Sequence, residues 1–386
     1  MLKRVIEADI DKYLKSDDFK TFYIWGPRRS GKTTLLKELS KELNVPIFNF
    51  DYLSDRVKFV SDKNILEKLV KDHKIILIDE VQNYSESTVI LKLLYDEFKI
   101  KVIATGSSEL RHKGIDFDSQ AGRYTEHYCL PLSISEIKSN TKLLFSDASR
   151  FENDLVENLQ IFGSYPEVYL LNSSNESLKI ELLSTILDAY VLKDIIDIYE
   201  LKNQKLAKDI LTKIALQLGG EVSIREIAAS TGSNAVTVSN YIEIFIKNYI
   251  LIPLPSFKTN ARRAVSDNRK LYFYDLGIRN ALVKDFRETK LRSDQGGLFE
   301  NFIVLELEKS RRNKKILANL YFYREYGGKE IDLIIEDYKK NYIAVEIKSK
   351  AGAVKKIFPI EHKSALINSK NYFQKIEDIF DLLKTV

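Results

Sequence analysis

A glycine-rich segment that ends in a lysine and two threonines carries the clearest chemistry in the chain. It follows the pattern G-x-x-x-x-G-K-T, and its residues are Gly26, Pro27, Arg28, Arg29, Ser30, Gly31, Lys32, Thr33 and Thr34. In such a phosphate loop, backbone N–H groups curl around phosphate oxygens and the lysine reaches the β- and γ-phosphates. The Thr33 hydroxyl is expected to ligate Mg²⁺. We therefore predict a nucleoside triphosphate site with ATP and Mg²⁺ as ligands.

An acidic pair, Asp79-Glu80, follows four aliphatic residues and supplies the partners that a phosphate loop needs. Asp79 is expected to hold the Mg²⁺ shell. Glu80 is expected to orient and deprotonate the attacking water. This spacing predicts hydrolysis of the bound nucleotide.

Two further groups are candidates for the same reaction. Thr105 and Ser107 end an apolar run, where a γ-phosphate sensor sits in ring-forming and switch ATPases, although a plain strand-to-helix turn is the open alternative. Arg123 follows Gly122 and is a candidate arginine finger, in cis or from a neighbouring subunit. A surface arginine is the alternative for Arg123.

A second set of charged residues lies near the carboxyl terminus. Glu300 shares a helix face with aliphatic residues, and a hairpin centred on Lys339 would place Asp332 opposite Glu346. Lys348 would point to the same face. We expect Asp332 and Glu346 to hold Mg²⁺ or Mn²⁺ and Lys348 to stabilise charge on a phosphate. An exposed charged face of an edge hairpin is the alternative.

These residues need strands and helices to position them. Apolar runs at residues 22–25, 45–50, 75–79 and 101–105 alternate with helical spacings, which predicts an α/β domain with a parallel sheet over residues 1–148. The ligand is expected at the carboxyl ends of the strands. The helical spacing of apolar residues over 149–218 predicts a helical lid or connector, which is interrupted by a turn at residues 163–167.

The pattern of residues 219–263 predicts a winged helix-turn-helix. A short helix at 224–228 and a turn at 231–233 precede a helix at 234–247, whose inward residues are expected to be Val236, Val238, Tyr241, Ile242 and Phe245. Such helices read DNA grooves, and they also serve as plain packing modules. Basic residues beyond the helix favour contact with the DNA backbone. They are Lys258, Arg262, Arg263, Arg269 and Lys270, with Arg311 and Arg312 further along.

The composition sets outer limits on the function. The 60 basic and 55 acidic residues make the chain mildly basic, which permits nucleic-acid binding without requiring it. The single cysteine, Cys129, excludes an intrachain disulfide and a cysteine-based zinc site. No stretch reads as a signal peptide or a membrane span, so we expect a cytoplasmic protein without a membrane partner.

The chain resembles bacterial and archaeal AAA-type ATPases with a D-E-x-Q box, here residues 79–82, fused to a winged helix and a restriction-endonuclease-like domain, here residues 264–386. Further matching segments are 122–123, 131–133, 165–167, 193–195, 274–277 and 299–301. The resemblance implies ATP hydrolysis. An ATP-driven enzyme acting on DNA, with a C-terminal domain that binds or cuts DNA, is the leading interpretation. A STAND-like signalling or defence switch and a non-cleaving DNA-binding scaffold are the alternatives, and assembly as a homo-oligomer stays open.

Overall fold

The computed structural model describes residues 2–106, 122–141, 148–172, 175–194, 203–258, 269–325, 327–349 and 352–384. The chain divides into two compact units, Met1–Pro131 and Leu132–Val386. The first unit ends before residue 148, where the sequence placed the end of the ATPase core. Helix α6 (Ile134–Asn140) therefore belongs to the second unit.

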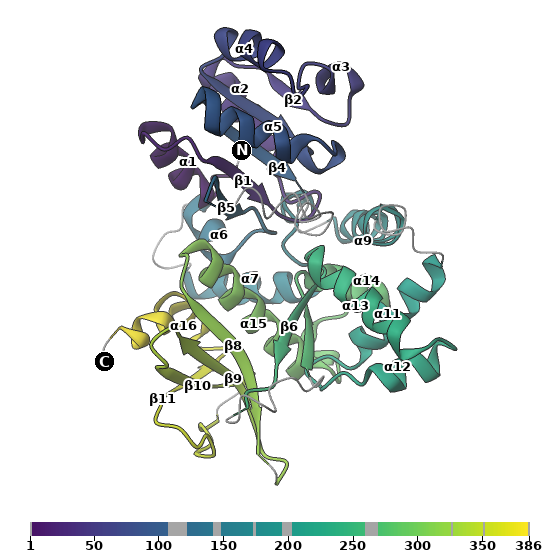
Figure 1. The fold of residues 1–386 in the computed structure, drawn as a ribbon. Helices are drawn as coiled ribbons and strands as arrows, with labels where there is room; N and C mark the ends of the chain where they lie inside the picture. The colour runs from purple at the N-terminus through teal and green to yellow at the C-terminus, as the bar shows by residue number, and fades with distance from the viewer. Residues whose placement is uncertain are drawn as a thin grey trace. The chain divides into compact units, whose positions relative to one another are not determined.

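The first unit is built on a parallel five-stranded sheet, as predicted (Figure 1). Its strands are β1 (Thr21–Trp25), β2 (Ile47–Asn49), β3 (Ile75–Asp79), β4 (Lys101–Gly106) and β5 (Tyr124–Tyr128), in the spatial order β2-β3-β4-β1-β5. Every residue of β1 and β3 is buried, as the unbroken apolar runs of a covered parallel sheet require. The phosphate loop follows β1 and the acidic pair ends β3, so both lie at the carboxyl edge.

Helices of the first unit cover this sheet. They are α1 (Ile6–Lys15), α2 (Lys32–Leu43), α3 (Leu53–Arg56), α4 (Lys63–Asp72) and α5 (Ser87–Leu93), with a 3₁₀ turn η1 (Val81–Asn83) and a π-helical turn η2 (Leu94–Phe98). Helix α1 buries Ile6, Ile10 and Tyr13, a spacing that forms one apolar face. That face and α2 pack in one core with Phe22 and Ile24 of β1.

The second unit begins with helices around a shared apolar core. They are α6, α7 (Ala148–Phe162), α8 (Pro166–Tyr169), α9 (Glu176–Thr185), π-helical η6 (Ile186–Asp194), α11 (Gln204–Leu216), α12 (Ile224–Ser230), α13 (Ala235–Lys247) and α14 (Leu276–Val283). The predicted turn at 163–167 does separate α7 from α8. In α13, Val238, Tyr241 and Phe245 enter the core as predicted. The prediction for Val236 is wrong, because its side chain is 71% exposed in the first turn of the helix.

A two-stranded antiparallel sheet follows α13. It pairs β6 (Leu251–Pro255) with β7 (Arg269–Phe273), and Leu251 and Phe273 join the same core as the helices. This pairing crosses the boundary expected at residues 263 and 264. Strand β7 therefore belongs with the helical segment by its packing, although it was expected in the C-terminal domain.

The last part of the chain forms a mixed four-stranded sheet in the order β11-β10-β9-β8 (Figure 1). Its elements are the 3₁₀ turn η8 (Thr289–Leu291), α15 (Gln295–Asn313), β8 (Ala318–Arg324), β9 (Glu330–Asp337), β10 (Tyr342–Lys348), β11 (Lys363–Asn368), α16 (Tyr372–Asp378) and the 3₁₀ turn η9 (Ile379–Leu383). Strands β9 and β10 pair with Val345 opposite Leu333 and Tyr342 opposite Glu336. This register is centred on Lys339, as predicted, and the paired residues end at Val345 and Leu333, one residue short of Glu346 and Asp332.

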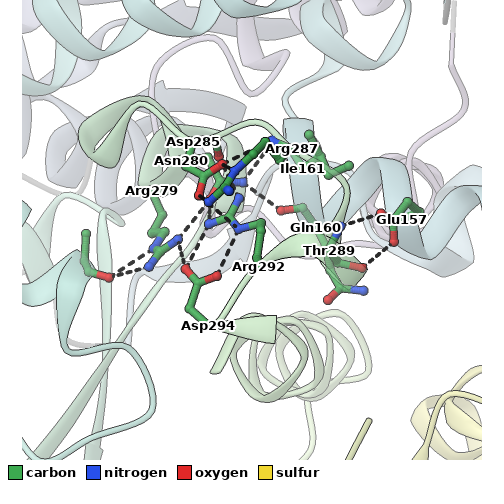
Figure 2. Close-up of polar contacts among 11 residues, drawn as sticks. Glu157, Gln160, Ile161, Arg279, Asn280, Asp285, Arg287, Thr289, Arg292 and Asp294 are labelled. Carbon is green, nitrogen blue, oxygen red and sulfur yellow. Dashed lines mark hydrogen bonds and ion pairs between the residues drawn. The ribbon is translucent and has the colours of Figure 1, made fainter. Parts of the chain in front are cut away.

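A buried polar network holds the segment that leads into α15 (Figure 2). Arg279 of α14 donates to the carbonyl of Ala215 at 2.7 Å and pairs with Asp294 at 2.6 Å. Arg292 also binds Asp294, and the Asn280 amide donates to the α7 carbonyls of residues 160 and 161. Because Asp294 directly precedes α15, this network fixes where the helix begins, and with it the position of Glu300 in its second turn.

Candidate functional site

The phosphate loop connects β1 to α2 with a tight backbone. Gly31 has a φ of 102°, which favours glycine. A Cβ atom at Gly26 would lie 2.0 Å from the carbonyl oxygen of Cys129, so only glycine fits there. The helix N-terminus that follows Gly31 is a ready site for an anion. The two glycines of the motif are thus required by this backbone.

Lys32 and Thr33 are the first two residues of helix α2, and their side chains lie at the carboxyl ends of the strands. The Lys32 ammonium is buried and donates to the carbonyls of Gly26 and Pro27 at 2.8 and 2.7 Å. Burial lowers the pKa of Lys32, and Glu80 and Asp79 partly restore it. The Thr33 hydroxyl donates to Asp79 Oδ2 at 2.8 Å. Mg²⁺ that is bound with a nucleotide takes its ligands from phosphate oxygens and from a few protein oxygens. The Thr33 hydroxyl and the Asp79 carboxylate are oxygen ligands of this kind, so these residues fit that ion.

Glu80 follows Asp79 in an unusual backbone conformation. Its φ is 53°, and a left-handed residue other than glycine is strained and concentrates at functional sites. The Gln82 side-chain amide donates to Glu80 Oε2. The glutamine of the D-E-x-Q box therefore holds the carboxylate expected to orient water, a contact that the sequence order alone did not predict.

Of the other residues predicted for the nucleotide site, one lies beside Asp79 and another lies away from it. The Thr105 hydroxyl, at the end of β4, donates to Asp79 Oδ1, so it lies beside the site. Ser107 lies outside the described residues. Arg123 lies at the opposite edge of the sheet, because its carbonyl accepts from Thr21 at the start of β1, and its guanidinium pairs with Asp96 at 2.8 Å. The geometry contradicts a cis arginine finger, and only a role in a neighbouring subunit stays as a hypothesis.

Arg4 is a site residue that sequence reasoning missed. It precedes α1, and its buried guanidinium donates to the Ser30 carbonyl at 2.7 Å and to the Leu130 carbonyl at 2.5 Å. Arg4 thus fastens the phosphate loop to the chain beyond β5. No local motif marks it, because its partners lie 26 and 126 residues away.

The second predicted set meets on one face of the β9–β10 hairpin. Asp332 Oδ2 accepts from the Ile347 backbone and from Lys348 Nζ, both at 2.8 Å. Lys348 Nζ also lies 2.9 Å from Glu346 Oε2. Burial acts to lower the pKa of Lys348, but Asp332 and Glu346 outweigh it and raise the pKa to about 12. The Lys348 ammonium group therefore lies as the positive partner between two carboxylates.

Glu300 approaches this set from α15, with two partners that the sequence did not predict. Lys270 and Tyr272 of β7 bind Glu300 Oε1 at 2.9 and 2.5 Å. Burial raises the pKa of Glu300, the Lys270 charge lowers it, and the nearby Asp332 raises it further. Glu300 thus feels the charge of Asp332 and is held by β7.

The C-terminal acids also fit a divalent cation. Glu346 is fully buried, with Lys348 Nζ 2.9 Å from its Oε2 atom and Lys355 Nζ 3.5 Å from its Oε1 atom. Burying two neighbouring carboxylates is costly without positive charge, and a divalent cation is one group that would supply it. Mg²⁺ often takes only one or two protein carboxylates, with water and phosphate oxygens as its other ligands. No cluster of three or more metal-ligating side chains occurs within the described ranges, so the donor set is this pair of acids.

Most of the basic residues expected to contact DNA are engaged elsewhere. Lys270 is buried, and Arg269 pairs with Glu243 at 2.6 Å. Arg311 and Arg312 both bind Glu308. Lys258 is half-buried, whereas Arg262 and Arg263 lie outside the described residues. The interpretation of Lys270 as a DNA-backbone contact is wrong, because its ammonium faces two glutamates.

Comparison with known families identifies the first domain. Residues 18–138 match the family described as an AAA domain. Residues 153–290 and 295–385 match two families described as domains of unknown function, DUF8612 and DUF4143. The first match supports the predicted AAA-type ATPase domain.

Relatives span nearly the whole chain. An uncharacterized protein of Methanocaldococcus jannaschii is 26% identical over 363 residues, which cover 89% of this chain and 77% of the relative. One of Haemophilus influenzae is 25% identical over 388 residues, which cover 94% and 92%. The order of segments is therefore shared between an archaeon and a bacterium.

Solved structures give weaker likenesses. Thermotoga maritima RuvB, a Holliday junction branch migration motor, has a TM-score of 0.29 at 17% identity, over 61% of this chain and 82% of its own. A Bacteroides Pif1 complex with ADP-AlF4 has a TM-score of 0.24 at 15% identity, over 53% and 57%. TM-scores of this size support no statement about activity. As to membranes, none of the described helices combines the length and apolar character needed to cross a bilayer.

Proposed function

We propose that the chain is a Mg²⁺-dependent ATPase that acts on DNA. The observation that carries the nucleotide part is the contact of Thr33 with Asp79, which joins the two motifs at one point of the sheet edge. Glu80, in its left-handed conformation, lies beside them. The phosphate loop, the Mg²⁺ residues and the water-orienting acid thus share one edge, which ATP hydrolysis requires.

The residue roles follow from these contacts. Backbone N–H groups of residues 26–34 bind the phosphates, and the Lys32 ammonium exchanges its carbonyl partners for β- and γ-phosphate oxygens. Bound Mg²⁺ neutralises charge on the phosphates. Thr33 and Asp79 hold that ion, Thr105 orients Asp79, and Gln82 holds the Glu80 carboxylate until a water molecule is in line. Glu80 then accepts the proton of that water.

The DNA part rests on the arrangement of α11, α12, α13, β6 and β7. Three helices followed by an antiparallel pair match a winged helix, in which α13 would enter a DNA groove. Val236 and Thr237 lie in the exposed first turn of α13. We assign residues 203–273 to this module, Met1–Pro131 to the ATPase core, and residues 132–202 to the helical connector.

A second activity, metal-dependent cleavage of DNA, is favoured by the C-terminal acids. Helix α15 and the sheet of β8 to β11 resemble the core of a restriction-type nuclease, with Asp332, Glu346 and Lys348 on one hairpin face. In this proposal Asp332 and Glu346 hold the cation, and Lys348 stabilises charge on the scissile phosphate. The meeting of Lys348 with both Asp332 and the fully buried Glu346 is the observation that favours cleavage over a scaffold.

Turnover separates the DNA-acting enzyme from a signalling or defence switch. An enzyme that works on DNA hydrolyses ATP continuously and faster when DNA is present, whereas a switch hydrolyses slowly and responds to nucleotide exchange. We expect stimulation by branched, single-stranded or duplex DNA, measured as phosphate release at low and high salt. Phosphate release that no DNA changes, at any salt concentration, would favour the switch.

A further inference from the structure

Strand β7 brings a lysine and a tyrosine to the C-terminal acids from outside their sheet. Lys270 and Tyr272 are two residues apart, so both side chains leave the same face of β7. Lys270 Nζ lies 2.9 Å from Glu300 Oε1 and 2.5 Å from Glu330 Oε1. The Tyr272 hydroxyl donates to the same Glu300 oxygen at 2.5 Å. A single ammonium group therefore sits between two carboxylates of different elements.

This ammonium group is buried and paired on two sides. The Lys270 side chain is 1% exposed. Burial alone would lower its pKa, but Glu300 and Glu330 outweigh burial and raise it, so Lys270 stays charged. Lys348 differs, because its side chain is 37% exposed and can leave the carboxylates for a substrate phosphate. Of the two lysines, only Lys348 can make way for a cation.

The two lysines define two neighbouring cation positions. One lies between Asp332 and Glu346, where Lys348 Nζ is 2.8 and 2.9 Å from the acids. The other lies between Glu300 and Glu330, where Lys270 is fixed. Glu330 and Asp332 are only two residues apart on β9, so the positions adjoin. Arg324 also donates to Glu330 Oε2, at 2.9 Å.

We propose that Lys270 takes the place of a second divalent cation, so that the C-terminal site holds one metal ion, between Asp332 and Glu346. This inference rests on the proposed cleavage function. Two buried carboxylates need a positive partner, and an ammonium group built into β7 supplies it permanently. Lys270 acts as a positioning residue, because it holds Glu300 and Glu330 without touching the reacting phosphate.

Counting bound Mn²⁺ tests the proposal directly. The full-length chain, free of nucleotide, is equilibrated with Mn²⁺, and bound ions are counted by electron paramagnetic resonance. The Asp332→Ala/Glu346→Ala chain gives the baseline for ions bound elsewhere, including the phosphate loop. Above that baseline we expect one ion for the wild type and for Lys270→Arg, and two for Lys270→Met. Adding Glu330→Gln to Lys270→Met should return the count to one.

The outcomes distinguish a failure of the role of Lys270 from a failure of the proposed cleavage site. A folded Lys270→Met chain that binds no more Mn²⁺ than the wild type would overturn the role of Lys270. A wild-type count of two would overturn it without any variant, even if Lys270→Met fails to fold. A wild-type count of zero would contradict the cleavage site instead. In that case, one new ion in Lys270→Met would support the role of Lys270, and no new ion in that variant would overturn it.

Discussion

The Thr33 hydroxyl donates a 2.8 Å hydrogen bond to Asp79 Oδ2 across 46 positions of sequence. Thr33 comes from the phosphate loop and Asp79 from the end of β3, and strand β4 lies between β1 and β3 in the sheet. Two motifs read separately from the sequence thus meet at one point. We infer from the contact that Thr33 and Asp79 would hold the nucleotide's Mg²⁺ together.

Thr33→Ala should raise the Mg²⁺ concentration needed for half-maximal ATP hydrolysis by at least about tenfold, as loss of a metal-site partner usually does. Thr33→Ser, which keeps the hydroxyl, is the matched control and should stay near the wild type. The measurement is a Mg²⁺ titration of phosphate release at saturating ATP. Equal Mg²⁺ requirements in both variants would show that Thr33 does not ligate the ion.

Gln82→Ala should lower kcat for ATP hydrolysis more than it changes KM, because Gln82 touches Glu80 and not the phosphate loop. Loss of one hydrogen bond to a carboxylate is worth about 1.5 to 3 kcal/mol, or roughly a tenfold or larger drop. Gln82→Glu, a near-isostere that cannot donate this bond, should lower kcat at least as much. Steady-state kinetics of the three proteins decide it, and a change confined to KM would contradict the positioning role.

Gly277→Ala should destabilise the second unit strongly. A Cβ atom at Gly277 would lie 2.2 Å from the Phe162 carbonyl oxygen, where α14 meets the end of α7. Overpacking of this kind costs about 1–3 kcal/mol or more. Gly296→Ala is the control, because a Cβ there would meet no described atom within 4 Å. Thermal unfolding should therefore show a lower Tm for Gly277→Ala only, and equal losses in both variants would contradict this packing.

Asp275 should give the stability a distinctive pH dependence. Burial raises its pKa from 3.8 to about 6, although hydrogen bonds from the Ser164 and Ile278 backbone N–H groups act to lower it. A raised carboxyl pKa stabilises the fold fully below the unfolded value, and that contribution disappears as the pH rises through 6. Between pH 4 and 7 the wild type should therefore lose roughly 3 kcal/mol relative to Asp275→Asn. Denaturant unfolding of both proteins across this range measures the difference, and parallel profiles would contradict it.

Local patterns predicted the features that depend on neighbouring residues in sequence. The phosphate loop, the acidic pair and the parallel sheet each follow from one motif or one apolar run. The hairpin register around Lys339 was also predictable, because a short turn sets which residues face each other. In the same way, the break at residues 163–167 follows from its glycine and proline.

Residues that act through distant contacts were not predictable in this way. Arg4, Lys270 and Tyr272 have partners far along the chain, and nothing in their local sequence marks those partners. Val236 was misplaced because a periodic apolar pattern does not show where a helix leaves the core. Arg123 was placed near the nucleotide by order along the chain, whereas the direction of β5 sets it at the opposite sheet edge.

The central claim is that Glu80 orients the water and Lys32 holds the phosphates. It is tested most directly by measuring ATP binding and ATP hydrolysis together in Glu80→Gln and Lys32→Ala. Glu80→Gln should bind ATP as tightly as the wild type while phosphate release falls at least about a hundredfold. Lys32→Ala should lose both, because the phosphate charge has no ammonium partner. Hydrolysis by Glu80→Gln at the wild-type rate would contradict the account.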